Sequence, residues 1–194
     1  MRSKILALLL ILVFSGCSFK QQRVDINHYS IDFKSSEKVD KAKFDSIFIE
    51  DVNVNRSFNL TSIFYNTKPY LFEEYVKNRW VNLPSNMIYN QLTDSFISSN
   101  IFENIVLRDK KIEYKYALKT EVIKIYQTFK DDKSYAILKI KFDLIKDNKI
   151  LKSYNFDKEV LCETNDAYGF VKAVNIGFDE VVNSLLDSLV LIKI

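Results

Sequence analysis

The chain has 194 residues, with a hydrophobic content of 47%, only three glycines and two prolines, and a formal net charge of +3. This length and apolar content suffice for one domain with a buried core. A charge so close to neutral gives no field that would recruit nucleic acid or anionic lipid, and the scarcity of glycine argues against a glycine-rich phosphate loop.

The first 16 residues have the pattern of a secretory signal. Arg2 and Lys4 precede an apolar run over residues 5–14, which is too short to span a bilayer as a helix of about 20 residues. Gly16 and Cys17 stand shortly after this run, at the position where a signal of this kind is cleaved. We therefore predict a bacterial lipoprotein signal that is cleaved between Gly16 and Cys17, with acyl chains attached to Cys17. The alternatives are an ordinary secretory signal and an uncleaved anchor.

Cleavage and acylation would leave an anchored, exported domain. Loss of residues 1–16 removes two basic and no acidic residues, so the net charge of +3 falls by two. Several acyl chains on one residue anchor stably, whereas one chain is marginal. Residues 17–27 are predicted to be the lipidated cysteine and a short polar tether, and residues 28–194 a single domain. Ser18 resembles the residue after the cysteine in lipoproteins sorted to the outer membrane, so we expect that membrane, facing the periplasm, rather than the inner membrane.

The first half of the predicted domain combines strands with one helix. Apolar and polar residues alternate in several segments, which indicates half-buried strands. Pro84, which is tolerated in a first helical turn, precedes Ile88, Leu92 and Phe96 at intervals of four, so a helix is predicted from Pro84 to about Ser99. The strands are expected over residues 28–33, 46–54, 62–65 and 69–80, with a polar loop at 35–43 and a turn at 66–68.

The second half repeats this arrangement. Apolar residues at intervals of three and four between Val174 and Leu189 predict a long amphipathic helix that begins near Tyr168. Strands are expected over residues 101–107, 114–122, 136–144 and 150–161, with a polar hairpin turn at 146–149. The expected order is β-β-β-β-α-β-β-β-β-α. Strands grouped in hairpins with two helices indicate an α+β fold, with a mostly antiparallel sheet and both helices packed on it.

The sequence carries no specific signature of catalysis or metal binding. His28 is the only histidine, so the usual general base is scarce, and no cysteine or carboxylate cluster lies near it. Glu73 and Glu74 are neighbours on a predicted strand and should point to opposite faces, which favours a solvated edge over a catalytic pair. Cys162 follows two apolar residues and is interpreted as a buried, inert thiol, with a reactive or intermolecular thiol as the alternative. We expect no enzymatic activity, no metal, and no cofactor beyond the acyl chains on Cys17.

Residues 63–87 resemble a known family. They combine a tyrosine-bearing strand, the tripeptide Asn-Arg-Trp, and a proline that opens a helix shortly afterwards. In this order the segment resembles the ABC-type transport auxiliary lipoproteins, the lipoprotein partners of MCE-type lipid transporters, including the Pqi-like and Mla-like systems. The predicted lipoprotein signal and the order of elements from about Tyr29 onward agree with it. The specific likeness is confined to residues 63–96, and the polar loop at 35–43 departs from it.

The resemblance implies a non-catalytic auxiliary component of an ABC/MCE-type lipid transport system of the bacterial envelope. Its partners would be the membrane, through the lipid anchor, an MCE-domain protein with its permease and ATPase, and phospholipid, but not nucleic acid. Tyr75, Arg79, Trp80 and Pro84 are the candidate residues. Aromatic rings offer contact area with a polar group, and a guanidinium can stack on a ring or pair with a carboxylate. These residues either contact a transporter subunit or lock the corner between strand and helix.

Two other classes of function are open. A similar α+β lipoprotein could act as a protein-binding module in envelope assembly or in the activation of a cell-wall synthase, and a hydrolase with an unrecognised site is the third class. Neighbouring genes for an MCE protein, a permease and an ATPase would favour transport, whereas cell-wall or assembly genes would favour the second class. Formation of a homo-oligomer is compatible with each of them.

Overall fold

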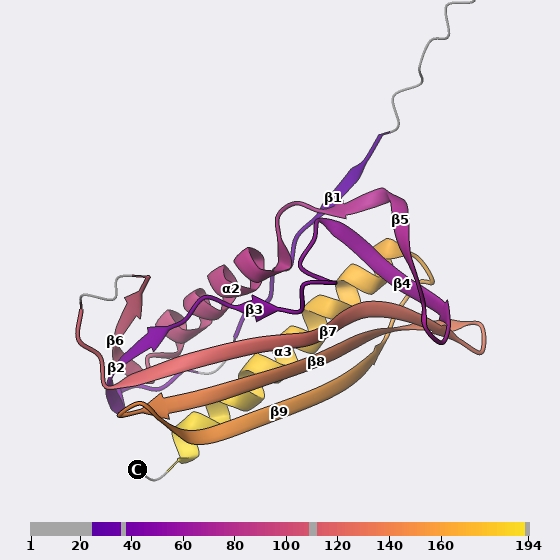
Figure 1. Ribbon diagram of the computed structural model, residues 1–194. Coiled ribbons are helices and arrows are strands. Elements are labelled where there is room, and N and C mark those ends of the chain that lie inside the picture. The colour runs from indigo at the N-terminus through magenta and orange to yellow at the C-terminus, as the bar shows by residue number, and fades with distance from the viewer. Residues whose placement is uncertain (1–24, 36–37, 109–111, 193–194) are drawn as a thin grey trace, which may run out of the picture.

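A computed structural model describes residues 25–35, 38–108 and 112–192 of the chain. In this part, a single domain is built from a sheet of nine strands and two helices (Figure 1). The α+β fold predicted from the sequence is confirmed. The predicted cleavage and lipidation site, Gly16 and Cys17, lies outside the described residues. None of the helices within the described ranges is long and apolar enough to cross a membrane.

The strands and helices have the following bounds. In chain order they are β1 (Asn27–Tyr29), β2 (Phe44–Ile49), β3 (Asn53–Val54), β4 (Ser62–Lys68), β5 (Leu71–Trp80), α2 (Pro84–Ser99), β6 (Phe102–Leu107), β7 (Tyr116–Lys130), β8 (Lys133–Lys146), β9 (Lys149–Leu161) and α3 (Ala167–Leu191). Helix α2 has the predicted bounds and ends at Asn100, whose φ of 55° is left-handed. Asparagine tolerates this conformation, which commonly terminates a helix.

Three long strands, β7, β8 and β9, form the frame of the sheet. They pair antiparallel along almost their whole length. The turn between β7 and β8 has positive φ at Asp131 and Asp132, and the turn between β8 and β9 has positive φ at Asp147 and Asn148. This is the geometry of tight two-residue hairpins, and aspartate and asparagine accommodate it better than most residues. The hairpin predicted at residues 146–149 is thus confirmed.

The shorter strands extend the frame in parallel. β2, β3 and β4 pair in parallel with successive parts of β7, and β6 pairs in parallel with β2. β5 returns antiparallel along β4, and β1 pairs in parallel with the end of β5. The sheet is therefore antiparallel in its long ladders, as predicted, and parallel where separate segments of the chain meet β7.

Several predicted strands have different bounds in the structure, and two of these differences have a clear physical cause. The strand predicted at 28–33 is hydrogen-bonded only over β1. Ile31 and Phe33 are buried, as their alternation indicated, but they lie in a connection that packs on α3, where Phe33 stacks on Phe178 at 5.2 Å. The strand predicted at 114–122 continues to Lys130, because a bulge between Val122 and Lys124 reverses the phase of the alternation without ending the ladder.

Two further predictions of local structure are wrong. The strand predicted at 46–54 is divided into β2 and β3, which pair with different parts of β7. The turn predicted at 66–68 lies at Pro69 and Tyr70 instead, because Asn66 pairs with Thr128 of β7 and keeps β4 extended. Proline has no N–H for the ladder, and Tyr70 completes the turn with a φ of 68°.

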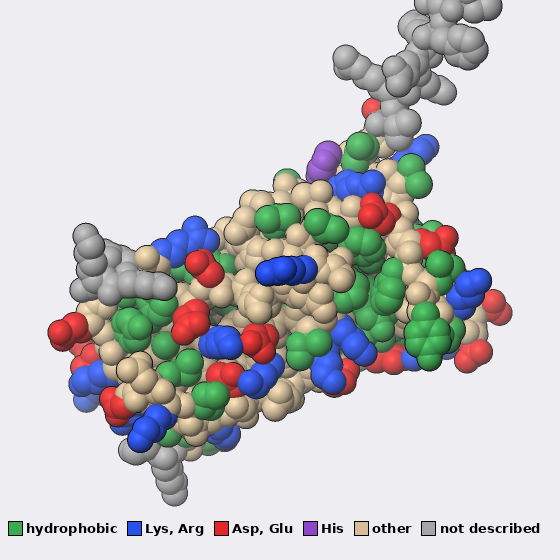
Figure 2. All heavy atoms as spheres, viewed as in Figure 1, with side chains coloured by type: hydrophobic (Ala, Val, Ile, Leu, Met, Phe, Trp, Pro, Cys, Tyr) green, Lys and Arg blue, Asp and Glu red, His purple; other side chains and the backbone are tan. Residues whose placement is uncertain are grey.

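Both helices cover one face of the sheet, and the long strands carry many charged side chains on the other face. α3 packs on β8 and β9, and α2 packs on β6 and on α3. They enclose a core that includes Phe96, Phe142, Phe170 and Phe178, all at most 1% exposed. The opposite face carries interleaved charges over the long strands (Figure 2). Its ion pairs are Lys119–Glu121, Lys130–Glu159, Lys139–Asp157 and Lys141–Asp143.

Candidate functional site

The hairpin of β4 and β5 contains three of the four candidate residues, Tyr75, Arg79 and Trp80, and has an unpaired edge. β1 pairs only with Asn78, Arg79 and Trp80 at the end of β5. Along residues 71–77, the side of β5 that faces away from β4 has no neighbouring strand in the described part of the chain. An unpaired edge presents backbone N–H and C=O groups that can pair with a strand of another molecule.

Trp80 and Pro84 lie in the interior, at the corner between the hairpin and α2. Trp80 is 3% exposed, and its ring lies 6.1 Å from that of Phe170 in α3. Its backbone N–H donates to the carbonyl oxygen of Thr61 at 2.7 Å. Pro84 is buried and opens α2 at a position where its missing N–H has no intrahelical partner. Both residues are therefore buried at this corner, and neither lies on an accessible surface.

Arg79 lies at an irregularity in the pairing of β4 and β5. Ser62 pairs with Arg79 and Phe64 with Glu74, so residues 75–78 of β5 are opposed only by Ile63. This irregularity leaves carbonyl groups of β5 without ladder partners. The guanidinium of Arg79 donates to the carbonyl oxygens of Tyr75 and Asn78, and lies 3.9 Å from the carboxylate of Glu74. Its main partners are therefore backbone carbonyls of its own strand.

A buried polar network joins the hairpin to the frame through Gln127. The hydroxyl of Tyr75 donates to Gln127 Oε1 at 2.6 Å, and Gln127 Nε2 donates to Ser134 Oγ at 2.8 Å and to the carbonyl oxygen of Asp166 at 3.3 Å. Burial raises the pKa of Tyr75 and that of the neighbouring Cys162 thiol. Cys162 is 5% exposed, so the prediction of a buried thiol is confirmed.

The sequence analysis did not predict Gln127. It follows the bulge of β7, so simple alternation from residues 114–122 does not show that its side chain points inward. A fully buried glutamine needs several partners, because each unsatisfied amide atom in the interior costs about 1–3 kcal/mol. Here the partners come from β5, β8 and the start of α3. Gln127 thereby fixes the position of the hairpin relative to the helix.

Apolar side chains are exposed at the tip and along the edge of the hairpin. Tyr70 is fully exposed, Val76 is 76% exposed and Phe72 is 44% exposed. Beside them lies a partly covered aromatic cluster, in which Phe58 and Tyr126 stack at 5.6 Å and Phe72 meets Tyr126 edge-on at 5.0 Å. Figure 2 shows hydrophobic side chains gathered at this end of the molecule. Aromatic rings exposed next to an unpaired strand edge are typical of binding surfaces.

The acidic neighbours on β5 are bound to hydroxyl groups. Glu74 accepts from Ser62 Oγ at 2.7 Å, and Glu73 accepts from Thr67 Oγ1 at 3.5 Å. Both side chains are exposed, and they interact with residues on different faces of β4, as their adjacent positions predicted. His28 is exposed on β1. Among the residues that the structure describes, no group of His, Cys, Asp or Glu side chains could hold a metal ion.

Known proteins resemble the chain in structure. No family model matches its sequence, and no curated protein does. Protein XCC0632 from Xanthomonas campestris, described as a DUF330 protein, matches at 14% identity and a TM-score of 0.73 over 84% of this chain and 94% of its own. A solved structure of an uncharacterized protein matches at 13% identity and a TM-score of 0.68 over 85% of this chain and 99% of its own.

A more distant match is PelC from Paraburkholderia phytofirmans, a dodecamer. It is 10% identical, with a TM-score of 0.45 over 78% of this chain and 93% of PelC. At the identities found for XCC0632 and the uncharacterized protein, the likeness shows the fold alone. The chain therefore shares its overall fold with XCC0632 and with the uncharacterized protein.

Proposed function

We propose that this protein is a membrane-anchored, periplasmic auxiliary component of an ABC/MCE-type lipid transport system, without catalytic activity of its own. The observation that supports this proposal is the position of the exposed hairpin edge. Strand β5, which carries that edge, also pairs with β1, the strand that directly follows the predicted tether. The residues that resemble the auxiliary lipoprotein family, 63–87, form this hairpin and the start of α2.

The proposed anchor would hold the hairpin close to the outer membrane. Residues 17–24 span at most about 29 Å even if fully extended, at about 3.6 Å per residue. An MCE-domain protein that reaches this membrane could add a strand to residues 71–77 of β5 or cover the exposed Tyr70, Phe72 and Val76. In this proposal the permease and the ATPase belong to the same complex, and phospholipid is its cargo. The domain contributes position and a docking edge.

Photo-crosslinking in cells tests the proposed partner. A photoreactive amino acid is placed at position 76, on the exposed edge of β5, or at position 176 on α3, where Ile176 is 53% exposed and serves as the matched control. We expect position 76, and not position 176, to capture an MCE-domain or permease subunit. Capture of only cell-wall synthase or assembly proteins would favour the alternative module, and equal capture from both positions would remove the assignment of the hairpin as the docking edge.

The variant Cys17→Ser tests the proposed anchor. We expect the domain to fold without an acyl chain, because the core that the structure describes is built from side chains between Ile31 and Leu189. We expect the variant to be released in the soluble periplasmic fraction, with the same urea midpoint as the wild-type domain. Fractionation followed by immunoblotting measures the release. If the variant stays in the membrane fraction although residues 1–16 have been removed, the lipid anchor is wrong. If transport by the variant equals that of the wild type, the anchor is dispensable for the proposed function.

A further inference from the structure

The turn of the β4–β5 hairpin holds a tyrosine in a conformation that tyrosine rarely adopts. Lys68 pairs with Leu71, so Pro69 and Tyr70 form the turn, and Tyr70 has a φ of 68°. Glycine and asparagine adopt this left-handed conformation at little cost, whereas a bulky side chain is strained in it. Packing against the described residues does not offset this strain, because Tyr70 is 100% exposed. A strained residue of this kind points to a role outside the domain.

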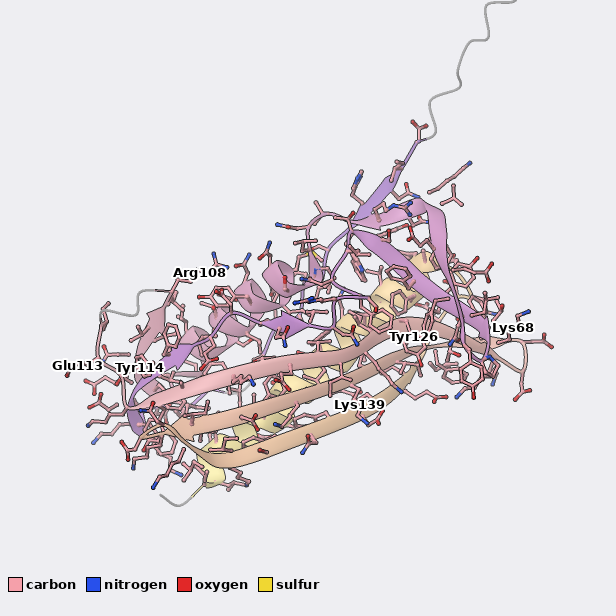
Figure 3. The ribbon with its side chains drawn as sticks, viewed as in Figure 1. Lys68, Arg108, Glu113, Tyr114, Tyr126 and Lys139 are labelled. Carbon is pink, nitrogen blue, oxygen red and sulfur yellow. The ribbon has the colours of Figure 1, made fainter. Side chains whose placement is uncertain are left out.

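Tyr70 begins a run of three exposed apolar side chains at the tip of the hairpin. Leu71 is 38% exposed and Phe72 is 44% exposed. Figure 3 shows Lys68 at this tip, at the opposite end of the molecule from Arg108. A projecting tip with this composition suits a bilayer. In such a setting tyrosine favours the interface, leucine and phenylalanine reach the acyl chains, and a flanking lysine extends to the headgroups.

The predicted anchor lies within reach of this tip. β1, the strand after the predicted tether, pairs with β5 from Asn78 onward. The part of β5 between Leu71 and Asn78 spans at most about 24 Å, at about 3.4 Å per residue, and residues 17–24 span at most about 29 Å. β1 and the hairpin tip lie at one end of the long sheet, and the C-terminal end of α3 lies at the other (Figure 1). A bilayer that holds acyl chains on Cys17 is therefore close enough for the tip to touch.

We propose that the hairpin tip inserts into the interface of the phospholipid bilayer that carries the lipid anchor. Tyr70 and Leu71 enter the bilayer, and Lys68 lies among the headgroups. The contact depends on apolar burial and not on anionic lipid, because the neighbouring turn between β7 and β8 contains the exposed Asp131 and Asp132. This inference rests on the anchor of the proposed function, and it leaves the unpaired edge of β5 to the protein partner.

A fluorescent label at position 70 tests the insertion. The protein is the exported chain with Cys17→Ser and an N-terminal hexahistidine tag, which binds it to phosphatidylcholine vesicles that contain nickel-chelating lipid. An environment-sensitive dye is attached to Tyr70→Cys or, as the control, to Leu191→Cys on α3, where Leu191 is 77% exposed. Cys162 is 5% exposed and is expected not to react in the folded protein. For position 70 alone, we expect fluorescence to rise by about twofold or more and doxyl-labelled lipid to quench it, at low and at high salt.

A variant without a dye tests the same contact. Tyr70→Asn with Leu71→Thr removes apolar surface, and asparagine tolerates the left-handed turn, so we expect the urea midpoint to stay the same or rise. Flotation of the untagged chain with phosphatidylcholine vesicles measures binding, which we expect to weaken by about fivefold or more. The matched variant, Ile176→Thr with Leu191→Asn, removes exposed apolar surface from α3 and is expected to float like the wild type.

Three results would overturn the proposal. The first is a dye at position 70 that stays in water on the vesicles, and the second is an equal loss of flotation in both double variants. The third is a photoreactive amino acid at position 70 that captures a protein and no lipid in cells, because the tip would then occupy a partner. The proposed function fails by other results, namely those of the Cys17→Ser fractionation and of crosslinking from position 76. Neither of these changes the outcome on vesicles, since the tag replaces the anchor there.

Discussion

Replacement of Trp80 by alanine is expected to lower the free energy of unfolding by about 3–5 kcal/mol, the range found when large buried aromatic residues are truncated. Trp80 is 3% exposed and lies between the hairpin and Phe170 of α3. Its removal leaves a cavity where β1, β5 and α3 meet. The surrounding backbone is fixed by hydrogen bonds from Trp80 to Thr61 and from Val81 to Tyr29, so we expect little collapse into that cavity.

Urea denaturation followed by far-ultraviolet circular dichroism measures this loss. Trp80 is the only tryptophan in the chain, so its fluorescence cannot report on the variant. Val81→Ala is the control, because Val81 is adjacent but 59% exposed, and we expect it to change stability by less than about 0.5 kcal/mol. If Trp80→Ala abolished crosslinking to a partner while leaving the urea midpoint unchanged, Trp80 would be a contact residue and its corner-locking role would be wrong.

The elements that the sequence predicted best are those determined by local periodicity. Helix α2 and the hairpin of β8 and β9 depend on neighbours within a few residues, namely Pro84 at a first turn and a polar turn between alternating strands. The errors occur where distant segments decide the structure. Asn66 stays extended because it pairs with Thr128, and the bulge after Val122 hides the continuation of β7. Pairing in parallel with β7 leaves no local trace in the sequence.

The same contrast between local and long-range determinants applies to the candidate sites. The segment that contains Trp80 and Pro84 was located by its likeness to a family, and its aromatic and proline residues mark the corner that the structure shows. Neither Gln127 nor the small buried cluster of Phe48, Val106 and Ala117 was predicted. That cluster combines side chains from three strands, and only the register between those strands brings them together. Without that register, each appears as one member of an ordinary strand.

The variant Gly169→Ala is expected to destabilise the protein, although alanine favours a helix more than glycine does. In helix interiors the preference for alanine is worth about 0.8–1 kcal/mol. A Cβ at position 169, however, would lie 2.1 Å from the backbone oxygen of Thr164 and 2.6 Å from its side-chain oxygen. Overpacking costs about 1–3 kcal/mol and occasionally more, and here the obstacle is backbone that no rotamer change can move. We expect a net loss of about 2 kcal/mol, measured by urea denaturation.

Gly177→Ala provides the comparison within the same helix. Its Cβ would lie 2.5 Å from the Cδ1 atom of Leu138, the end of a side chain that can rotate, so we expect a smaller loss than at Gly169. Displacement of Thr164 should also disturb the adjacent Asp166, whose carbonyl oxygen accepts from Gln127. Faster amide hydrogen exchange in β5 is therefore expected for Gly169→Ala and not for Gly177→Ala. A gain of stability in Gly169→Ala would instead show that the connection between β9 and α3 yields easily and does not hold the hairpin in place.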